Sequence, residues 1–175
     1  MGDRCSCTLT IGGILKLENI PLLASKLLAA DVSDYRKTAS KIEEALKRDT
    51  CSFAFYEVNY AQMNASLQEL LISLKLSFCW HNEAGSEYAA ADVYYDARID
   101  EMTEYNLIGD AISLTLDQIE KDADAVKKAR KWEAFSRNMK LCVVTSNHDL
   151  LAKETAGNLP EGYLSLLSET ALRAA

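Results

Sequence analysis

Four side chains with metal-binding chemistry occur as two short pairs, Cys5-x-Cys7 and Cys79-x-His81. Both pairs lie in apolar runs typical of β-strands, where every second side chain shares a face, so each pair presents both ligands together. If the two strands pair, four zinc ligands can converge. The spacing differs from that of most zinc sites, however, and cysteines in strands are commonly small buried hydrophobes. We therefore expect no metal or cofactor, and we keep a small metal-binding protein or enzyme using these residues as the alternative.

Catalytic signatures are missing elsewhere in the chain. Only His81 and His148 can serve as imidazole bases, and no serine lies in a G-x-S-x-G pattern. Gly12-Gly13 has no further glycine at the spacing of a dinucleotide-binding or phosphate-binding loop. Paired carboxylates are frequent in one acidic stretch, but glycosidase chemistry needs one of them buried with a raised pKa. We expect that the protein is not an enzyme.

Acidic and basic residues are segregated along the chain. Residues 83–124 hold twelve acids against two bases, a local charge of −10, whereas residues 127–140 hold six bases against one acid. The net charge of −7 hides this asymmetry, which informs about partners rather than about fold. An acidic protein repels nucleic acid, so we expect no direct nucleic-acid binding. The basic segment includes Trp132 and Phe135, and proteins that bind single-stranded nucleic acid also combine basic and aromatic residues. Both aromatic residues, however, fall on the apolar stripe of a predicted helix, which favours core packing.

A predicted strand over residues 88–99 carries part of the acidic block. Its core face would hold Val93, Tyr95, Ala97 and Ile99. The opposite face would be exposed to solvent, and the residues expected to contact a partner there or just beyond are Asp92, Tyr94, Asp96, Asp100, Glu101 and Glu104. Same-face neighbours lie about 6.6 Å apart, close to the phosphate spacing of DNA, so this row can mimic nucleic acid. An acidic strand also prevents edge-to-edge aggregation, and Arg98 within the row reduces its charge.

Apolar periodicity arranges these residues on a series of elements. Strands are expected over residues 5–11, 51–58, 76–81, 88–99, 103–108 and 141–145, with Gly12-Gly13 ending the first. Helices are expected over 21–30, from Ser33, after Asn64, over 115–139, near Leu150 and from Pro160. The long helix has an apolar stripe of Leu116, Ile119, Ala123, Val126, Trp132, Phe135 and Met139. This order lacks strict strand–helix alternation and predicts a single α+β domain over residues 1–175, an antiparallel or mixed sheet with helices mainly on one face.

Composition sets the expected environment. The 175 residues are 49% hydrophobic, yet no apolar run is long enough to span a membrane, and the start lacks a signal-peptide pattern. The five cysteines are odd in number and favour reduced, buried thiols over a disulfide framework. We expect a soluble cytoplasmic protein without a membrane partner.

Four motifs follow one another within residues 7–120: Thr8-Leu9-Thr10-Ile11-Gly12-Gly13 before a helix, a strand at residues 55–60, a further helix and an acidic tyrosine-rich hairpin. This order resembles small accessory proteins of phages and plasmids, including anti-restriction and anti-CRISPR proteins. The resemblance implies a non-enzymatic inhibitor that binds a host defence complex and blocks nucleic-acid access, and it assigns no role to any single residue. Together with the acidic block, it predicts an inhibitor that fills a basic nucleic-acid groove. A structural or regulatory subunit, including a homodimer through the long helix, remains the other alternative.

Overall fold

The computed structural model describes residues 4–30, 38–48, 52–59, 63, 65–85, 89–109 and 111–157. In chain order the elements are β1 (Arg4–Lys16), a short 3₁₀ helix (Leu17–Asn19), α1 (Ile20–Ala30), α2 (Ala39–Lys47), β2 (Ser52–Asn59), α3 (Ala65–Ser73), β3 (Ser77–Asn82), β4 (Ala91–Asp96), β5 (Glu101–Ile108), β6 (Ala111–Ile112), α4 (Leu116–Lys121), α5 (Ala125–Arg137), β7 (Leu141–Val144) and α6 (Asn147–Thr155). The predicted α+β class is confirmed.

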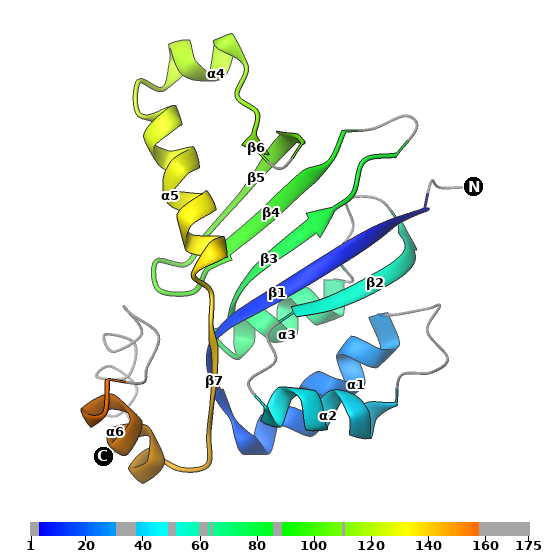
Figure 1. The fold of residues 1–175 in the computed structure, drawn as a ribbon, viewed down its shortest axis with the longest axis vertical. Helices are drawn as coiled ribbons and strands as arrows, with labels where there is room; N and C mark the ends of the chain where they lie inside the picture. The colour runs from blue at the N-terminus through cyan, green and yellow to red at the C-terminus, as the bar shows by residue number, and fades with distance from the viewer. Residues whose placement is uncertain are drawn as a thin grey trace.

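The described strands form a seven-stranded sheet in the order β2-β1-β3-β4-β5-β6, with β7 paired to the far end of β1 (Figure 1). The β1–β7 pairing is parallel and the other described pairings are antiparallel, so the sheet is mixed. β1 is the central strand, because its first part lies between β2 and β3 and its last part pairs with β7.

The prediction that Gly12-Gly13 ends the first strand is wrong, because β1 continues to Lys16. The glycines instead mark where β1 changes partners from β3 to β7, and the Gly13 N–H donates to the Lys140 carbonyl (2.9 Å). A Cβ atom on Gly12 would lie 2.2 Å from Cγ of Met139. A glycine is therefore needed at this position for the chain after α5 to cross closely over β1.

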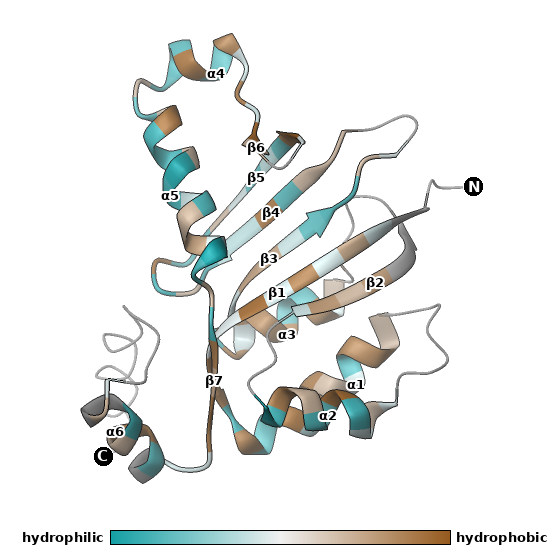
Figure 2. Cartoon of the chain, in the orientation of Figure 1, coloured by the Kyte–Doolittle hydropathy of each residue, from teal (hydrophilic) through white to brown (hydrophobic). Residues whose placement is uncertain are grey.

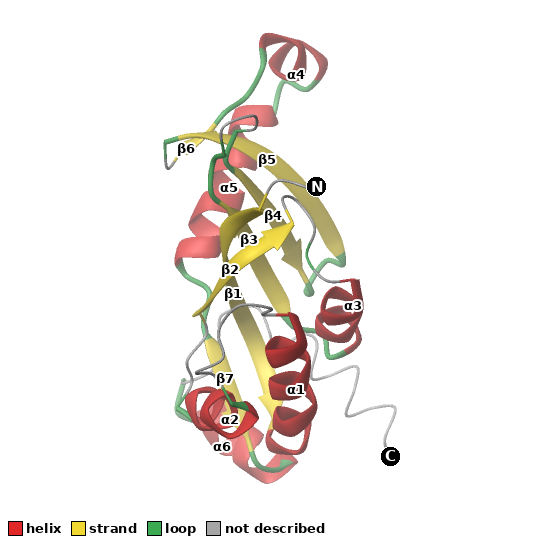
Figure 3. Ribbon diagram, turned by 90° about the vertical axis from the view of Figure 1, so that its right-hand side faces the viewer, coloured by secondary structure: helices red, strands yellow, loops and turns green. Residues whose placement is uncertain are grey.

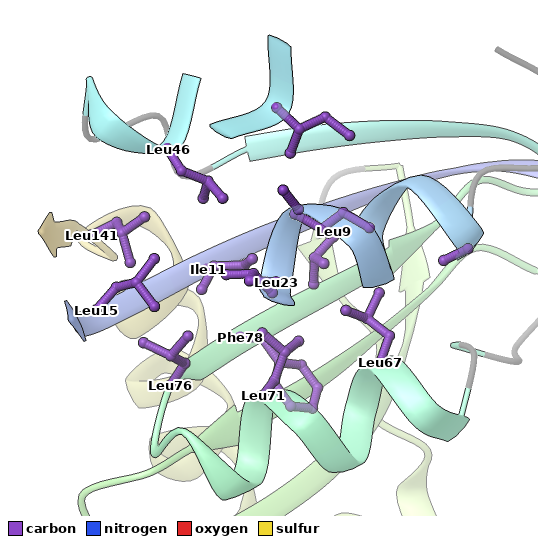
Figure 4. Packing of buried hydrophobic residues seen from close by; sticks show 14 of the residues in the cluster. Leu9, Ile11, Leu15, Leu23, Leu46, Leu67, Leu71, Leu76, Phe78 and Leu141 are labelled. Carbon is purple, nitrogen blue, oxygen red and sulfur yellow. The ribbon is translucent and has the colours of Figure 1, made fainter. Parts of the chain in front are cut away.

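One face of the sheet packs against α1 and α3 (Figure 3), and α2 packs beside α1. Because side chains alternate along a strand, every second residue of the sheet points into this layer. Figure 4 shows Leu9, Ile11 and Phe78 of the sheet against Leu23 of α1 and against Leu67 and Leu71 of α3. These side chains are fully buried and form the main hydrophobic core.

The predicted helix over residues 115–139 is two helices, and its predicted stripe is wrong in its first half. The capping box at Thr115 is present, since its hydroxyl accepts the Gln118 N–H and Gln118 Oε1 accepts the Thr115 N–H. Leu116 is 78% exposed. The chain becomes extended at Asp122, whose carboxylate then accepts the Asp124 N–H (3.0 Å) and so satisfies an unpaired donor at the start of α5. α5 buries Ala125, Ala129 and Trp132.

Several predicted features lie partly or wholly outside the described residues. They are Cys51, the cap at Asn64 and the helix from Pro160. The helix expected from Ser33 is described from Ala39, with the Thr38 side chain accepting the Lys41 N–H as its N-cap. Among the described helices, none combines the length and the apolar character that crossing a bilayer requires.

Candidate functional site

The second face of the sheet carries a group of polar side chains from β3 and β4. His81 lies opposite Asp92, and Cys79 lies opposite Tyr94. The Asp92 carboxylate joins them: Oδ1 is 2.6 Å from His81 Nδ1, and Oδ2 accepts the Tyr94 hydroxyl at 2.6 Å. The Cys79 thiol also hydrogen-bonds to Asp92. We call these four residues the Asp92 cluster.

A cysteine, a histidine and an aspartate in one cluster invite comparison with a nucleophilic site. A cysteine nucleophile reacts as the thiolate and needs a lowered pKa. Here burial, and next the Asp92 carboxylate, raise the pKa of Cys79 far above its ordinary 9.0. Burial and the hydrogen bond to Asp92 likewise raise the pKa of Tyr94 above its ordinary 10.0. The cluster therefore keeps its thiol and phenol protonated, which suits a satisfied buried network better than nucleophilic catalysis.

Helix α5 covers this second face over β3 and β4. The Trp132 ring centroid is 5.7 Å from that of Tyr94 and 5.5 Å from that of Phe135. Trp132 and Met139 form a second buried cluster with Cys79 and Tyr94. The layer also reaches β6, since the Ile112 N–H donates to Glu133 Oε1 (3.1 Å). The sheet is thus packed on both faces at Cys79 and Tyr94, whereas the His81 side chain of the Asp92 cluster is 36% exposed.

A buried ion pair lies at the end of β4. Asp96 is 3% exposed, and its carboxylate accepts Arg98 Nε (2.8 Å), Arg98 Nη2 (2.7 Å) and the Arg98 N–H (3.0 Å). The Arg98 guanidinium also lies over the Phe135 ring of α5, 5.0 Å from its centroid. Asp96 and Arg98 therefore close the β4–β5 turn and help to dock α5.

The predicted solvent-exposed row is wrong for Tyr94 and Asp96, which are buried, whereas Asp92 is half-buried. The predicted alternation is right, because Tyr95 and Ala97 are buried on the other face. The opposite face is covered by α5 rather than by solvent, so Tyr94 is only 1% exposed. Tyr94 and Asp96 therefore cannot contact a partner directly while α5 stays in place, and a partner-binding role for Asp92 stays a prediction.

The other three predicted contact residues do lie at the surface. Asp100, Glu101 and Glu104 are exposed, and Asp100 accepts the Tyr95 hydroxyl (2.9 Å) in a turn where its own φ is +53°. Ile99, predicted to face the core, lies in the same turn and is 48% exposed. A partner-binding role for the three acids stays a prediction.

The four-ligand metal hypothesis fails at Cys7. β1 and β3 do pair, but Cys7 lies opposite Asn82 and donates its thiol to Asn82 Oδ1 (3.2 Å) on the main-core side. Cys79 and His81 face the other side, because they are offset by an odd number of residues from Asn82. The side chain of Cys5 lies outside the described part. Within that part, no three or more His, Cys, Asp or Glu side chains are arranged to hold a metal ion.

The exposed part of the acidic block runs along one edge of the sheet, from the β4–β5 turn along β5 to α4 (Figure 1), and α4 carries both hydrophilic and hydrophobic residues (Figure 2). We call this region the β5–α4 surface. Its exposed acids are Asp100, Glu101, Glu104, Asp117, Glu120 and Asp124. Its exposed apolar side chains are Ile99, Met102, Ile108, Leu116 and Ile119. The sequence shows the acids but not which of them α5 would bury.

Comparisons with protein families, with curated proteins and with solved structures found no match. The resemblance to anti-restriction and anti-CRISPR proteins therefore stays a prediction. Function has to be inferred from the residues of this chain.

Proposed function

We propose that this protein is a non-enzymatic, acidic inhibitor that binds a nucleic-acid-handling defence complex in the cytoplasm. In this proposal the β5–α4 surface occupies a basic groove of the complex and blocks the access of nucleic acid. The observation that carries the proposal is the gathering of exposed acids and apolar side chains on this surface. Exposed apolar side chains with a charged surround are typical of protein-binding sites.

The nearby bases leave much of this charge uncompensated. Arg98 is engaged with Asp96, Lys121 with Asp117 (2.9 Å) and Lys128 with Asp122 (2.6 Å). Within the described residues, no ion pair involves Glu101 or Glu104. These carboxylates can therefore attract a basic partner, which favours fast association that weakens as salt increases.

The protonated state of the Asp92 cluster supports a binding role over an enzymatic one. The Asp92 cluster holds its thiol, Cys79, in the unreactive protonated form under Trp132 and Met139. A catalytic thiol would need the reverse shift of its pKa.

The proposal is tested by inhibition of purified complexes. Affinity capture with mass spectrometry identifies candidates, and DNA binding by purified restriction and CRISPR effector complexes is then measured with and without the protein. We expect inhibition that weakens at higher salt and is reduced in the double variant Glu101→Gln, Glu104→Gln. The matched control is Glu18→Gln, Glu44→Gln, which removes as many exposed charges near the other end of the sheet and should inhibit like the parent. Equal inhibition by both double variants at every salt concentration contradicts the proposal.

A further inference from the structure

Strand β5 has one hydrogen-bonding edge that is partly open. The Leu107 N–H donates to the Ala90 carbonyl (2.8 Å), so odd-numbered residues of β5 direct their backbone groups toward β4. The Ser113 N–H donates to the Asn106 carbonyl (2.8 Å), so even-numbered residues direct theirs outward. β6 pairs only at the C-terminal end of β5. The outward amide and carbonyl groups of Met102 and Glu104 thus face no described strand.

The open part of β5 has neither the bulge nor the proline that often protects a sheet edge, although the exposed Glu101 and Glu104 disfavour its pairing with another acidic strand. Its pairing with β4 is continuous from Glu101 to Asn106, without a bulge, and the segment contains no proline. The edge strands of natural β-sheets are normally shortened, bulged or covered, because their open backbone groups can pair with another strand. Addition of a partner's strand to such an edge is a recurrent mode of peptide recognition.

The side chains along this edge indicate what the added strand would carry. Glu101 and Glu104 are three positions apart, so they lie on opposite faces of the sheet. Cross-strand neighbours of opposite charge are favourable, and like charges are unfavourable. A strand with two basic residues three positions apart would place one beside each carboxylate. Met102, 42% exposed, and the half-buried Tyr105 offer one apolar neighbour on each face.

We propose that β5 binds an extended segment of a partner protein as an additional strand, and that this segment carries Lys or Arg at positions i and i+3. The proposal deepens the proposed function, since it rests on the partner being basic. A second copy of this chain fits less well, because pairing β5 with itself brings the acids of both strands to one edge.

Synthetic peptides of alternating β-favouring residues test the pairing directly. The probe peptide has two lysines three positions apart, and the first control has them two positions apart on one face. The second control is the probe with N-methyl groups on the amides that would pair with β5. Hydrogen exchange at Met102 and Glu104 is followed by NMR on the full chain. We expect the probe to slow exchange at both amides about tenfold, with little effect from either control. No protection by the probe, or equal protection by the N-methylated peptide, overturns the proposal.

Two variants separate backbone pairing from side-chain contact. Met102→Pro removes an outward N–H and keeps both acids, and proline is tolerated where the N–H of an edge strand faces away from its neighbour. Met102→Ala removes the same side chain and keeps the N–H. We expect Met102→Pro to bind the probe peptide about tenfold more weakly than Met102→Ala. Equal affinity of the two folded variants overturns the proposal, and if Met102→Pro fails to fold, the N-methylated peptide decides.

The remaining outcomes distinguish this inference from the proposed function. If Glu101→Gln, Glu104→Gln weakens inhibition of the complex while both Met102 variants inhibit equally, the proposed function stands and the added strand is refuted. If the peptide adds to β5 but no complex is inhibited, the added strand stands and the proposed function fails. A concentration-dependent dimer in ultracentrifugation, with both amides protected without peptide, replaces the partner strand by self-pairing and overturns the proposal.

Discussion

Replacing Asp96 with Asn tests whether this carboxylate belongs to a buried ion pair rather than to an exposed acidic row. The side chain of Asp96 is 4% exposed and that of Arg98 is 27% exposed. Removing one partner of a fully buried pair costs about 3–5 kcal/mol, because the other charge is left unpaired. Asn keeps one acceptor, and solvent screens part of the Arg98 charge. We therefore expect a loss of about 2–3 kcal/mol in the free energy of unfolding.

Thermal unfolding measures this loss, since one kcal/mol lowers the Tm of a domain of this size by about 2–4 °C. We expect Asp96→Asn to lower the Tm by about 5–10 °C. Glu101→Gln is the matched control: it lies opposite Asp96 on β5, loses the same charge and is exposed, so its effect should stay below about 0.5 kcal/mol. Adding Arg98→Met to Asp96→Asn should restore part of the stability. Equal melting of Asp96→Asn and Glu101→Gln would refute the burial of this pair.

Three further predictions concern the contact between α5 and the sheet. Gly12→Ala should lower the free energy of unfolding by about 1–3 kcal/mol, because its Cβ would overlap Met139. In denaturant unfolding, adding Met139→Ala should recover part of that loss, and purely additive losses would contradict the clash. The free energy of unfolding should be level up to about pH 9 and fall above it, because the folded state keeps the Cys79 and Tyr94 protons that the unfolded chain releases. Each of the two groups contributes a slope of up to about 1.4 kcal/mol per pH unit. Cys79→Ala should reduce this slope, and an unchanged slope would exclude the thiol as its source. Trp132→Ala should lower the free energy of unfolding by about 3–5 kcal/mol and should speed the alkylation of Cys79 by iodoacetamide. Alkylation of Cys79 at the parent's rate would show that α5 does not shield the thiol.

Local sequence signals predicted many elements, because capping and alternation act over a few residues. The Thr115 capping box and the strand near residues 103–108 are confirmed. The signals fail where a distant contact decides the outcome. Gly12-Gly13 looks like a break, yet Met139 from far along the chain packs on it and β1 continues. The helix over residues 115–139 looks continuous, yet α4 ends at an extended Asp122, whose carboxylate accepts the N–H of Asp124, the N-cap of α5.

By itself, the sequence determined the α+β class, the two faces of β4 and the concentration of acids in residues 83–124, since each depends only on the order of residues. Only the tertiary structure decided what covers each face. A polar face opposite a core can be exposed to solvent or covered by a second layer of helix, and α5 supplied that layer over Tyr94 and beside the Asp96–Arg98 ion pair. Strand register likewise separated Cys7 from Cys79 and His81, because a shift of one residue exchanges the faces of a strand. Because β6 pairs only with the last residues of β5, the rest of β5 is left at the sheet edge, where Glu101 and Glu104 stay exposed.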